Sequence, residues 1–267
     1  MGFKCGIVGL PNVGKSTLFN ALTASKNAEA ANFPFCTIDP NIGIVDVVDE
    51  RLDQLTKLSN SKKKIYTNIT FVDIAGLVKG ASKGEGLGNK FLSHIREVDA
   101  IIHLVRCFES DKITHVNSKI NPLDDLETIK TEIILSDLDI VQKKLEKGKK
   151  KLLEEKEVKI LEDKLSQLND GKEVVPNNKE EEKFLTTLGL LSIKPKIIVC
   201  NVDEESLAKG NSYTESVKKN YSEEKVVTIC ADIEDQIMSL DNDERETFMK
   251  EIGLNKTGLN QLIKEGY

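Results

Sequence analysis

Segments rich in apolar and β-branched residues alternate along the chain with segments of helical periodicity. The strand-like segments span residues 3–10, 42–48, 65–72, 100–105, 196–200 and 225–230. Residues 16–23 and 87–98 have helical spacing, and in the second of these Leu87, Phe91 and Ile95 recur every four residues. Because apolar strands separated by helices are typical of a sheet covered on both faces, the pattern predicts an α/β fold with a mostly parallel sheet.

Residues 123–168 follow a different pattern, without a proline or a strand signal. Apolar residues recur there with heptad spacing, first at Ile134, Leu138, Val141 and Leu145 and then at Val158, Leu161, Leu165 and Leu168. Because such seams join pairs of helices, the pattern predicts an antiparallel helical hairpin, a coiled coil, that turns at residues 147–151. Its arms of about 24 residues would each be about 36 Å long. One long helix kinked at Gly148 is the alternative.

Strand signals resume after the hairpin, which is therefore expected to be an insertion. Residues 1–122 and 195–267 would form the α/β domain, and residues 123–194 would form the inserted helical domain. No apolar run approaches the roughly 18 residues of a membrane span, so no membrane contact is expected.

The cysteine content indicates the cellular compartment, and the net charge limits the kinds of partner. Five cysteines without a CxxC pair argue against a disulfide framework or a zinc site, and indicate a reducing cytoplasm. A net charge of −6 argues against a protein that coats nucleic acid, but it is compatible with a local basic patch. Lysines are concentrated around the predicted hairpin turn, at Lys143, Lys144, Lys147, Lys149, Lys150 and Lys151.

Residues 9–16, with the sequence GLPNVGKS, match the phosphate-loop pattern GxxxxGK[ST] between a strand and a helix. Glycines let backbone N–H groups curl around phosphate oxygens, and the following helix directs its positive end at them. In this chemistry Lys15 neutralises the β- and γ-phosphates, and the Ser16 hydroxyl binds Mg²⁺. The motif therefore predicts a nucleoside triphosphate site.

Two further segments extend this site. Asp73 and Gly76 form a DxxG pattern after the strand 65–72, where the carboxylate can hold Mg²⁺ through water and the glycine N–H can reach the γ-phosphate. Thr37 lies between the first helix and the second strand, where a threonine can complete the magnesium shell when the γ-phosphate is present. The predicted metal ligands are therefore Ser16, Thr37 and, through water, Asp73.

These motifs resemble the Obg-type P-loop GTPases, which are related to translation factors, and most closely the YchF group of Obg-like ATPases. The similar segments are residues 6–17, 32–41, 71–89 and 106–109, together with the predicted hairpin. The resemblance implies a Ras-like G domain with an inserted hairpin, and the ribosome or ribosomal RNA as the partner. A small ubiquitin-like TGS domain follows in that family, and this sequence ends at Tyr267, where the TGS domain would begin. We therefore expect that domain to be missing here.

The residues after the strand 196–200 differ from the guanine-reading pattern Asn-Lys-x-Asp. The sequence is Asn201-Val202-Asp203-Glu204, so a valine replaces the lysine and the last carboxylate is on a longer side chain. Asn201 has donors and acceptors that can pair with the N6 amino group and N1 of adenine. If Asp203 or Glu204 bound guanine, the protein would instead be a GTPase.

For the base, the resemblance implies that ATP is preferred to GTP, with contacts from Asn201, Val202 and Glu204. A second base-contacting loop would be formed by Cys230 and Ala231. The contacts implied for the phosphate loop are Asn12, Val13, Gly14, Lys15, Ser16 and Thr17.

Leu77 follows the DxxG pattern, where ordinary GTPases have a glutamine that orients the attacking water. By resemblance, Asn12 matches an asparagine that supports a potassium ion in some relatives, and His115 matches a histidine placed near the γ-phosphate. A group supplied by a partner is a third way to position the water, and an ordinary surface histidine is the alternative interpretation of His115. We expect catalysis to involve Lys15, Gly76 and His115, with slow turnover. Cys36 borders Thr37; a half-buried structural cysteine is the simpler interpretation, and a redox-sensitive thiol is the alternative.

The sequence thus predicts a Mg²⁺-dependent ATPase that acts as a switch, binds ribosomes and regulates translation or a stress response. One alternative is a GTPase of the Obg type. Another is a nucleotide-gated ribosome-binding scaffold with negligible hydrolysis, in which the hairpin is the functional part. The lysines of the hairpin turn would contact RNA phosphates, and a solvated turn is the alternative interpretation.

Overall fold

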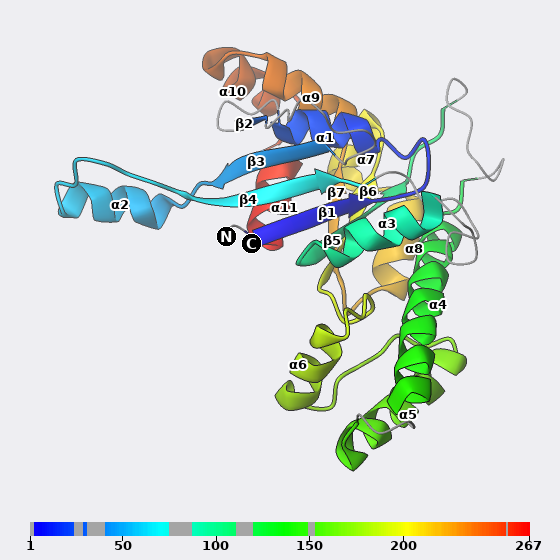
Figure 1. Ribbon diagram of the computed structural model, residues 1–267. Coiled ribbons are helices and arrows are strands. Elements are labelled where there is room, and N and C mark those ends of the chain that lie inside the picture. The colour runs from blue at the N-terminus through cyan, green and yellow to red at the C-terminus, as the bar shows by residue number, and fades with distance from the viewer. Residues whose placement is uncertain are drawn as a thin grey trace.

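A seven-stranded sheet forms the centre of the structure (Figure 1). The computed structural model describes residues 3–23, 29–30, 41–74, 87–110, 120–148, 153–254 and 256–267. The strands are β1 (Phe3–Val8), β2 (Glu29–Ala30), β3 (Asn41–Val47), β4 (Thr67–Asp73), β5 (Ala100–Arg106), β6 (Lys196–Asn201) and β7 (Lys225–Ile229). Their order is β2-β3-β4-β1-β5-β6-β7. The six strands expected from the sequence are all present, and β2 is additional.

The strands from β4 to β7 pair in parallel, whereas β3 pairs antiparallel with β4 on one side and with β2 on the other, so β3 runs against the direction of its neighbours. All seven residues of β5 are buried, as expected for a central strand covered on both faces. The prediction of an α/β fold with a mostly parallel sheet is confirmed. The first strand ends at Val8 rather than at residue 10, because Gly9 already belongs to the loop that leads to the next helix.

Helices cover both faces of the sheet (Figure 1). One face holds α1 (Lys15–Thr23), α9 (Ala231–Ser239) and α10 (Asn242–Glu251), and the other holds α3 (Leu87–Arg96) and α8 (Ser212–Asn220). The short α7 (Glu204–Lys209) follows β6, and the last helix, α11 (Gly258–Gly266), packs against β7. Leu18 and Phe19 of α1 share the main core with Leu259 and Leu262 of α11.

A helical unit extends away from the sheet (Figure 1). It consists of α4 (Pro122–Gly148), α5 (Glu155–Asn169) and α6 (Lys179–Thr187), and α4 packs against α5. All eight residues of the two heptad seams lie in one apolar cluster, where Val141 and Leu161 are fully buried. The two helices therefore form a hairpin, and the alternative of one long helix kinked at Gly148 does not fit.

The expectation of equal arms is wrong. The first arm, α4, has 27 residues, whereas α5 has only 15, which correspond to about 40 Å and about 22 Å. The second arm is shorter because α5 ends at Asn169, and Gly171 follows with φ +72°, a conformation that glycine adopts without strain. The chain then folds back into α6, and Leu185 of α6 completes the apolar cluster.

Polar contacts join α4 to the segment that precedes β6 and to α3. The Asp137 carboxylate on α4 accepts hydrogen bonds from the backbone N–H of Leu191 at 2.8 Å, and from the N–H and hydroxyl of Ser192 at 2.9 and 2.6 Å. Arg96 at the end of α3 donates to the hydroxyl of Ser136 at 2.7 Å. The predicted boundaries after residues 122 and 194 lie next to α4 and β6, but the division into two domains stays a prediction. Within the described residues, no helix is both long and apolar enough to span a membrane.

Candidate functional site

The loop of residues 9–14 joins β1 to α1 and has two left-handed backbone positions, Asn12 with φ +64° and Gly14 with φ +93°. Gly9 and Gly14 are required in this loop because other groups lie too close to leave room for a Cβ atom. A Cβ at Gly9 would lie 2.7 Å from the Leu104 carbonyl oxygen, and a Cβ at Gly14 would overlap with Nδ2 of Asn201. The loop therefore takes the tight path that a phosphate-binding backbone needs.

Lys15 and Asp73 meet at the start of α1 and the end of β4. The Lys15 ammonium forms an ion pair with the Asp73 carboxylate, and both side chains are largely buried, with exposed fractions of 13% and 9%. The pairing of β1 with β4 brings them together, since Ile7 lies opposite Asp73 in that register. The sequence predicted that Lys15 binds the phosphates and that Asp73 binds the magnesium ion. The structure brings these two side chains into contact.

The beginning of α1 suits an anion. The first turn has no acidic side chain, so its positive end is not offset by a carboxylate of the same turn. Ser16, the second residue of the helix, is exposed, and its hydroxyl is accessible to a ligand. A hydroxyl and a carboxylate are hard oxygen donors of the kind that Mg²⁺ prefers, so Ser16 and Asp73 fit the ion. In the part of the chain that the structure describes, no cluster of three or more His, Cys, Asp or Glu side chains offers a different metal site.

Asn201 joins three loops of the site. Its Nδ2 donates to the Val13 carbonyl oxygen at 2.9 Å, and its Oδ1 accepts from the Ala231 N–H, also at 2.9 Å. The side chain is only 4% exposed. An amide has two N–H donors and two lone pairs, so one of each is left for a base after these bonds form. The contact with the phosphate loop was not foreseen from the sequence; the pairing with adenine stays a prediction.

The residues next to Asn201 have distinct environments. Val202 and Cys230 are buried in one apolar cluster, with exposed fractions of 2% and 4%, so any contact of theirs with a base would come from backbone atoms. Burial also raises the pKa of the Cys230 thiol. Asp203 caps α7, because its carboxylate accepts from the Ser206 N–H at 2.8 Å. Glu204 is exposed at the first position of α7.

Several predicted site residues lie outside the described residues, namely Thr37, Gly76 and His115, together with Leu77 and Cys36. The segment before residue 111 is well anchored. Arg106, at the end of β5, is 1% exposed, donates from Nε to the Phe108 carbonyl oxygen at 3.1 Å, and stacks its guanidinium 4.6 Å from the Phe108 ring. Asn211 donates to the Cys107 carbonyl oxygen at 2.7 Å.

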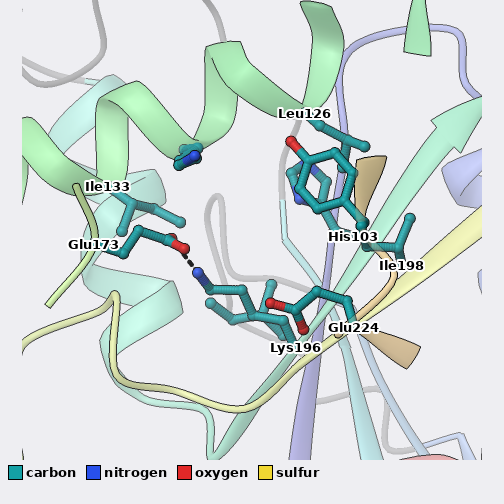
Figure 2. Close-up of a pocket in the computed structure, with 10 residues that line it drawn as sticks. His103, Leu126, Ile133, Glu173, Lys196, Ile198 and Glu224 are labelled. Atoms are coloured by element: carbon teal, nitrogen blue, oxygen red, sulfur yellow. Dashed lines mark hydrogen bonds and ion pairs between the residues drawn. The ribbon is translucent and has the colours of Figure 1, made fainter. Parts of the chain in front are cut away.

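A small pocket lies elsewhere, between α4 and the strands β5 and β6 (Figure 2). Its volume is about 30 Å³, far below the several hundred Å³ of a typical ligand site, so it is not the nucleotide site. Lys196 and Glu173 form an ion pair across it (Figure 2). His103 is buried in its wall, and this burial, helped by the charge of Lys196, lowers the pKa of the imidazole to about 3. As expected from the sequence, His103 is a strand residue, and it is neutral near pH 7.

Comparisons with known proteins agree with this geometry. A family model described as "50S ribosome-binding GTPase" matches residues 4–137. The ribosome-binding ATPase YchF of Escherichia coli O157:H7 is 50% identical over 278 aligned positions, which cover 100% of this chain and 76% of the relative. The protein of the same name from Bacillus subtilis is 48% identical with the same coverage.

A solved structure, that of the Schizosaccharomyces pombe YchF GTPase, matches with a TM-score of 0.84 at 34% identity. The match covers 100% of this chain and 75% of that one. The sheet, the helical hairpin and the phosphate loop thus belong to a fold that a solved relative shares along the full length of this chain. Together with the identity to the bacterial relatives, this shows that the chain belongs to the YchF family of P-loop proteins.

Proposed function

We propose that this chain binds ATP in preference to GTP, hydrolyses it with Mg²⁺, and acts as a switch on the ribosome in the cytoplasm. One observation supports this above all others: the Lys15 ammonium lies against Asp73 at the end of the phosphate loop. The bacterial relatives, which are named ribosome-binding ATPases, support both the reaction and the partner.

The phosphates would bind at the N-terminus of α1. Lys15 would leave its ion pair with Asp73 and neutralise the β- and γ-phosphates, while backbone N–H groups of the loop surround their oxygens. The Ser16 hydroxyl would hold Mg²⁺ directly, and the Asp73 carboxylate, once free of Lys15, would hold it through water, with Thr37 as a further ligand. When bound, the ion supplies positive charge where negative charge develops on the phosphates.

Catalysis would also use groups outside the described residues. Gly76 would donate its N–H to the γ-phosphate, and His115 would help to place the attacking water, because Leu77 cannot form a hydrogen bond with it. Asn12 is exposed at a left-handed position of the loop, where its side chain can support a potassium ion beside the phosphates. Such an ion would act as a fixed positive charge, so we propose that potassium increases turnover.

The choice of base follows from the residues around Asn201. The names of the relatives differ on this point, because the bacterial proteins are called ATPases and the yeast protein a GTPase. In this chain Val202 replaces the lysine of the guanine-reading pattern, and the Asp203 carboxylate already accepts a hydrogen bond from the Ser206 N–H. The carboxylate at the position of the guanine-reading aspartate belongs to Glu204, whose side chain is longer than that of aspartate, so it would not meet the donors of guanine in the usual geometry. The remaining donor and acceptor of Asn201 suit adenine.

Titration calorimetry with ATP and GTP tests the choice of base. A hydrogen bond to a charged group contributes about 1.5–3 kcal/mol, so ATP should bind at least about tenfold more tightly than GTP. Equal or tighter binding of GTP would refute the preference and favour the Obg-type GTPase. Turnover measured with and without ribosomes then separates an ATPase from a scaffold that binds nucleotide with negligible hydrolysis.

A further inference from the structure

The small pocket of Figure 2 lies where the helical unit meets the sheet. The strands β5 and β6 form one side of it and α4 forms another, and the segments that follow α5 and α8 complete the wall. Four aliphatic side chains line its apolar part, those of Ile101, Leu126, Ile133 and Ile198. The other six described residues that line it are polar or charged. The pocket therefore combines an apolar wall with groups that form hydrogen bonds.

His103, which lines this pocket, has a ring nitrogen without a protein partner. The side chain is 7% exposed, and its buried Nε2 has no hydrogen-bond partner among the described residues. Burial, helped by the charge of Lys196, lowers the pKa of the imidazole, so the ring is neutral and has one donor and one acceptor nitrogen. Buried polar atoms of folded proteins are usually hydrogen-bonded to protein or to ordered water, because an unpaired one is unfavourable.

The ion pair between Lys196 and Glu173 brings further polar groups into the same pocket (Figure 2). Both side chains are largely buried, with exposed fractions of 15% and 25%. The Lys196 ammonium has three N–H donors, of which the bond to Glu173 uses one. Glu224 adds a second carboxylate to the lining. A polar guest can therefore bond to both parts of the structure, since His103 and Lys196 belong to the sheet and Glu173 to the helical unit.

The size and the charges of the pocket decide which molecule fits. Its volume of about 30 Å³ is far too small for a metabolite, but a cavity needs only about 10–15 Å³ to hold a water molecule. A metal cation is a poor guest, because the Lys196 ammonium already brings a positive charge into this space. Water both donates and accepts hydrogen bonds, so it suits either neutral tautomer of His103. One or two water molecules therefore match the pocket in size and in chemistry.

We propose that this pocket is a binding site for ordered water that joins the helical unit to the sheet. A water molecule bonds to Nε2 of His103, and the remaining donors of Lys196 bond to the same molecule or to a second one. Such buried water is part of the structure and is costly to remove. The site accounts for a polar imidazole in β5, a strand whose residues are all buried. It lies apart from the nucleotide site, and the inference does not depend on the proposed function.

A high-resolution crystal structure of the chain tests the proposal directly. The wild type should have a water molecule within about 3.2 Å of Nε2 of His103. His103→Leu, which removes both ring nitrogens, should lose this water, whereas His103→Gln, which keeps a donor and an acceptor, should retain a water in the pocket. Crystals pressurised with xenon give a second result, because xenon enters dry apolar cavities and not hydrated ones. A wild-type pocket that has no water at Nε2, or that takes up xenon, would overturn the proposal.

Nuclear magnetic resonance on the wild type tests the site in solution, whether or not the variants fold. The chain has only three histidines, so the ring signals of His103 can be assigned. These ring protons should show a nuclear Overhauser effect from water with the sign of long-lived hydration. Tyr221→Phe is the matched control, because the Tyr221 hydroxyl lines the same pocket and can relay such a signal, although it donates to Glu127 at 3.1 Å. The effect should persist in this variant. If it vanishes there, or is absent from the wild type, the pocket does not hold the proposed water.

Discussion

Replacing Glu234 by glutamine should change the folding stability in a way that depends on pH. The stability of the variant minus that of the wild type should be larger at alkaline pH than at acidic pH. Glu234 lies on α9 and is fully buried. Its Oε1 accepts a hydrogen bond from the Gly258 N–H at 2.6 Å, and its Oε2 has no partner among the described residues. Burial raises the pKa of this carboxyl from 4.5 to about 7, against the opposing effect of the backbone N–H groups of Gly258 and Leu259.

The magnitude follows from linkage between protonation and folding. Between pH 4.5 and pH 7 the unfolded chain releases the proton of Glu234 while the folded protein keeps it, so folding stability falls as the pH rises. A pKa difference of about 2.5 corresponds to about 3 kcal/mol, which is fully lost above pH 7. Glutamine keeps the acceptor for Gly258 and has no charge at any pH. Its amide nitrogen adds a buried donor that costs about 1–3 kcal/mol, but this cost does not depend on pH.

Urea unfolding of both proteins from about pH 4.5 to about pH 8 measures the effect. The stability of Glu234→Gln minus that of the wild type should rise by about 3 kcal/mol over this range, with most of the change between pH 5 and pH 7. Glu162→Gln on the exposed side of α5 is the control, and its difference from the wild type should be constant. A constant difference for Glu234→Gln too would mean that Glu234 is not protonated in the folded protein, and the reasoning would fail.

Three other predictions concern function. Lys15→Ala should lower ATP turnover at least about 100-fold. Its circular dichroism spectrum should be unchanged, because the Lys15 ammonium of the wild type lies against Asp73 and not in the apolar core. Near-normal turnover would contradict the assignment of the phosphate site. His115→Ala should lower kcat and kcat/KM together without weakening nucleotide binding in calorimetry, and an unchanged kcat would leave His115 an ordinary surface residue. Changing four lysines of the hairpin turn to glutamine should weaken ribosome cosedimentation and flatten its salt dependence, with no effect on ATP hydrolysis by the free protein. These are Lys147, Lys149, Lys150 and Lys151, and equal pelleting at every salt concentration would indicate a solvated turn.

The sheet could be predicted because its strands are apolar on both faces, as β5 and β6 show. The hairpin could be predicted because the apolar residues of its two heptad seams pack together in one cluster between the helices. Most of the short helices were not predicted, because six to ten residues give few turns for a clear period. The equally short α1 and α3 were predicted because α1 follows the phosphate-loop motif and α3 has Leu87, Phe91 and Ile95 at helical spacing. Capping residues were the available signal: Asn211 with Thr214, and Asp241 with Glu244, form capping boxes at the starts of α8 and α10. The helix α2 (Glu50–Leu58) has no buried face, so burial could not have revealed it.

The phosphate side of the site was predictable because its chemistry lies in short contiguous motifs. The ion pair between Lys15 and Asp73 joins two of these motifs through the pairing of β1 with β4. The base side was less predictable. Asn201 could be singled out by type and position, but its hydrogen bond to Val13 spans 188 residues of sequence, and no local pattern indicates it. Likewise, the cap that Asp203 provides for α7 depends on where β6 ends.

The contacts of Asn201 have a consequence for how the site works. In the sheet, β5 separates β1, which leads to the phosphate loop, from β6 and β7, which lead to the base side. One amide group bridges this distance, because Nδ2 is bonded to the phosphate loop at Val13 and Oδ1 to the start of α9 at Ala231. A Cβ at Gly14 would overlap with the same amide, so the loop has little room to move independently of it. A base that displaced Asn201 would therefore also displace the loop that binds the phosphates. Discrimination between adenine and guanine at this residue is for that reason coupled to the geometry around Lys15, and a poorly fitting base should lower turnover as well as affinity.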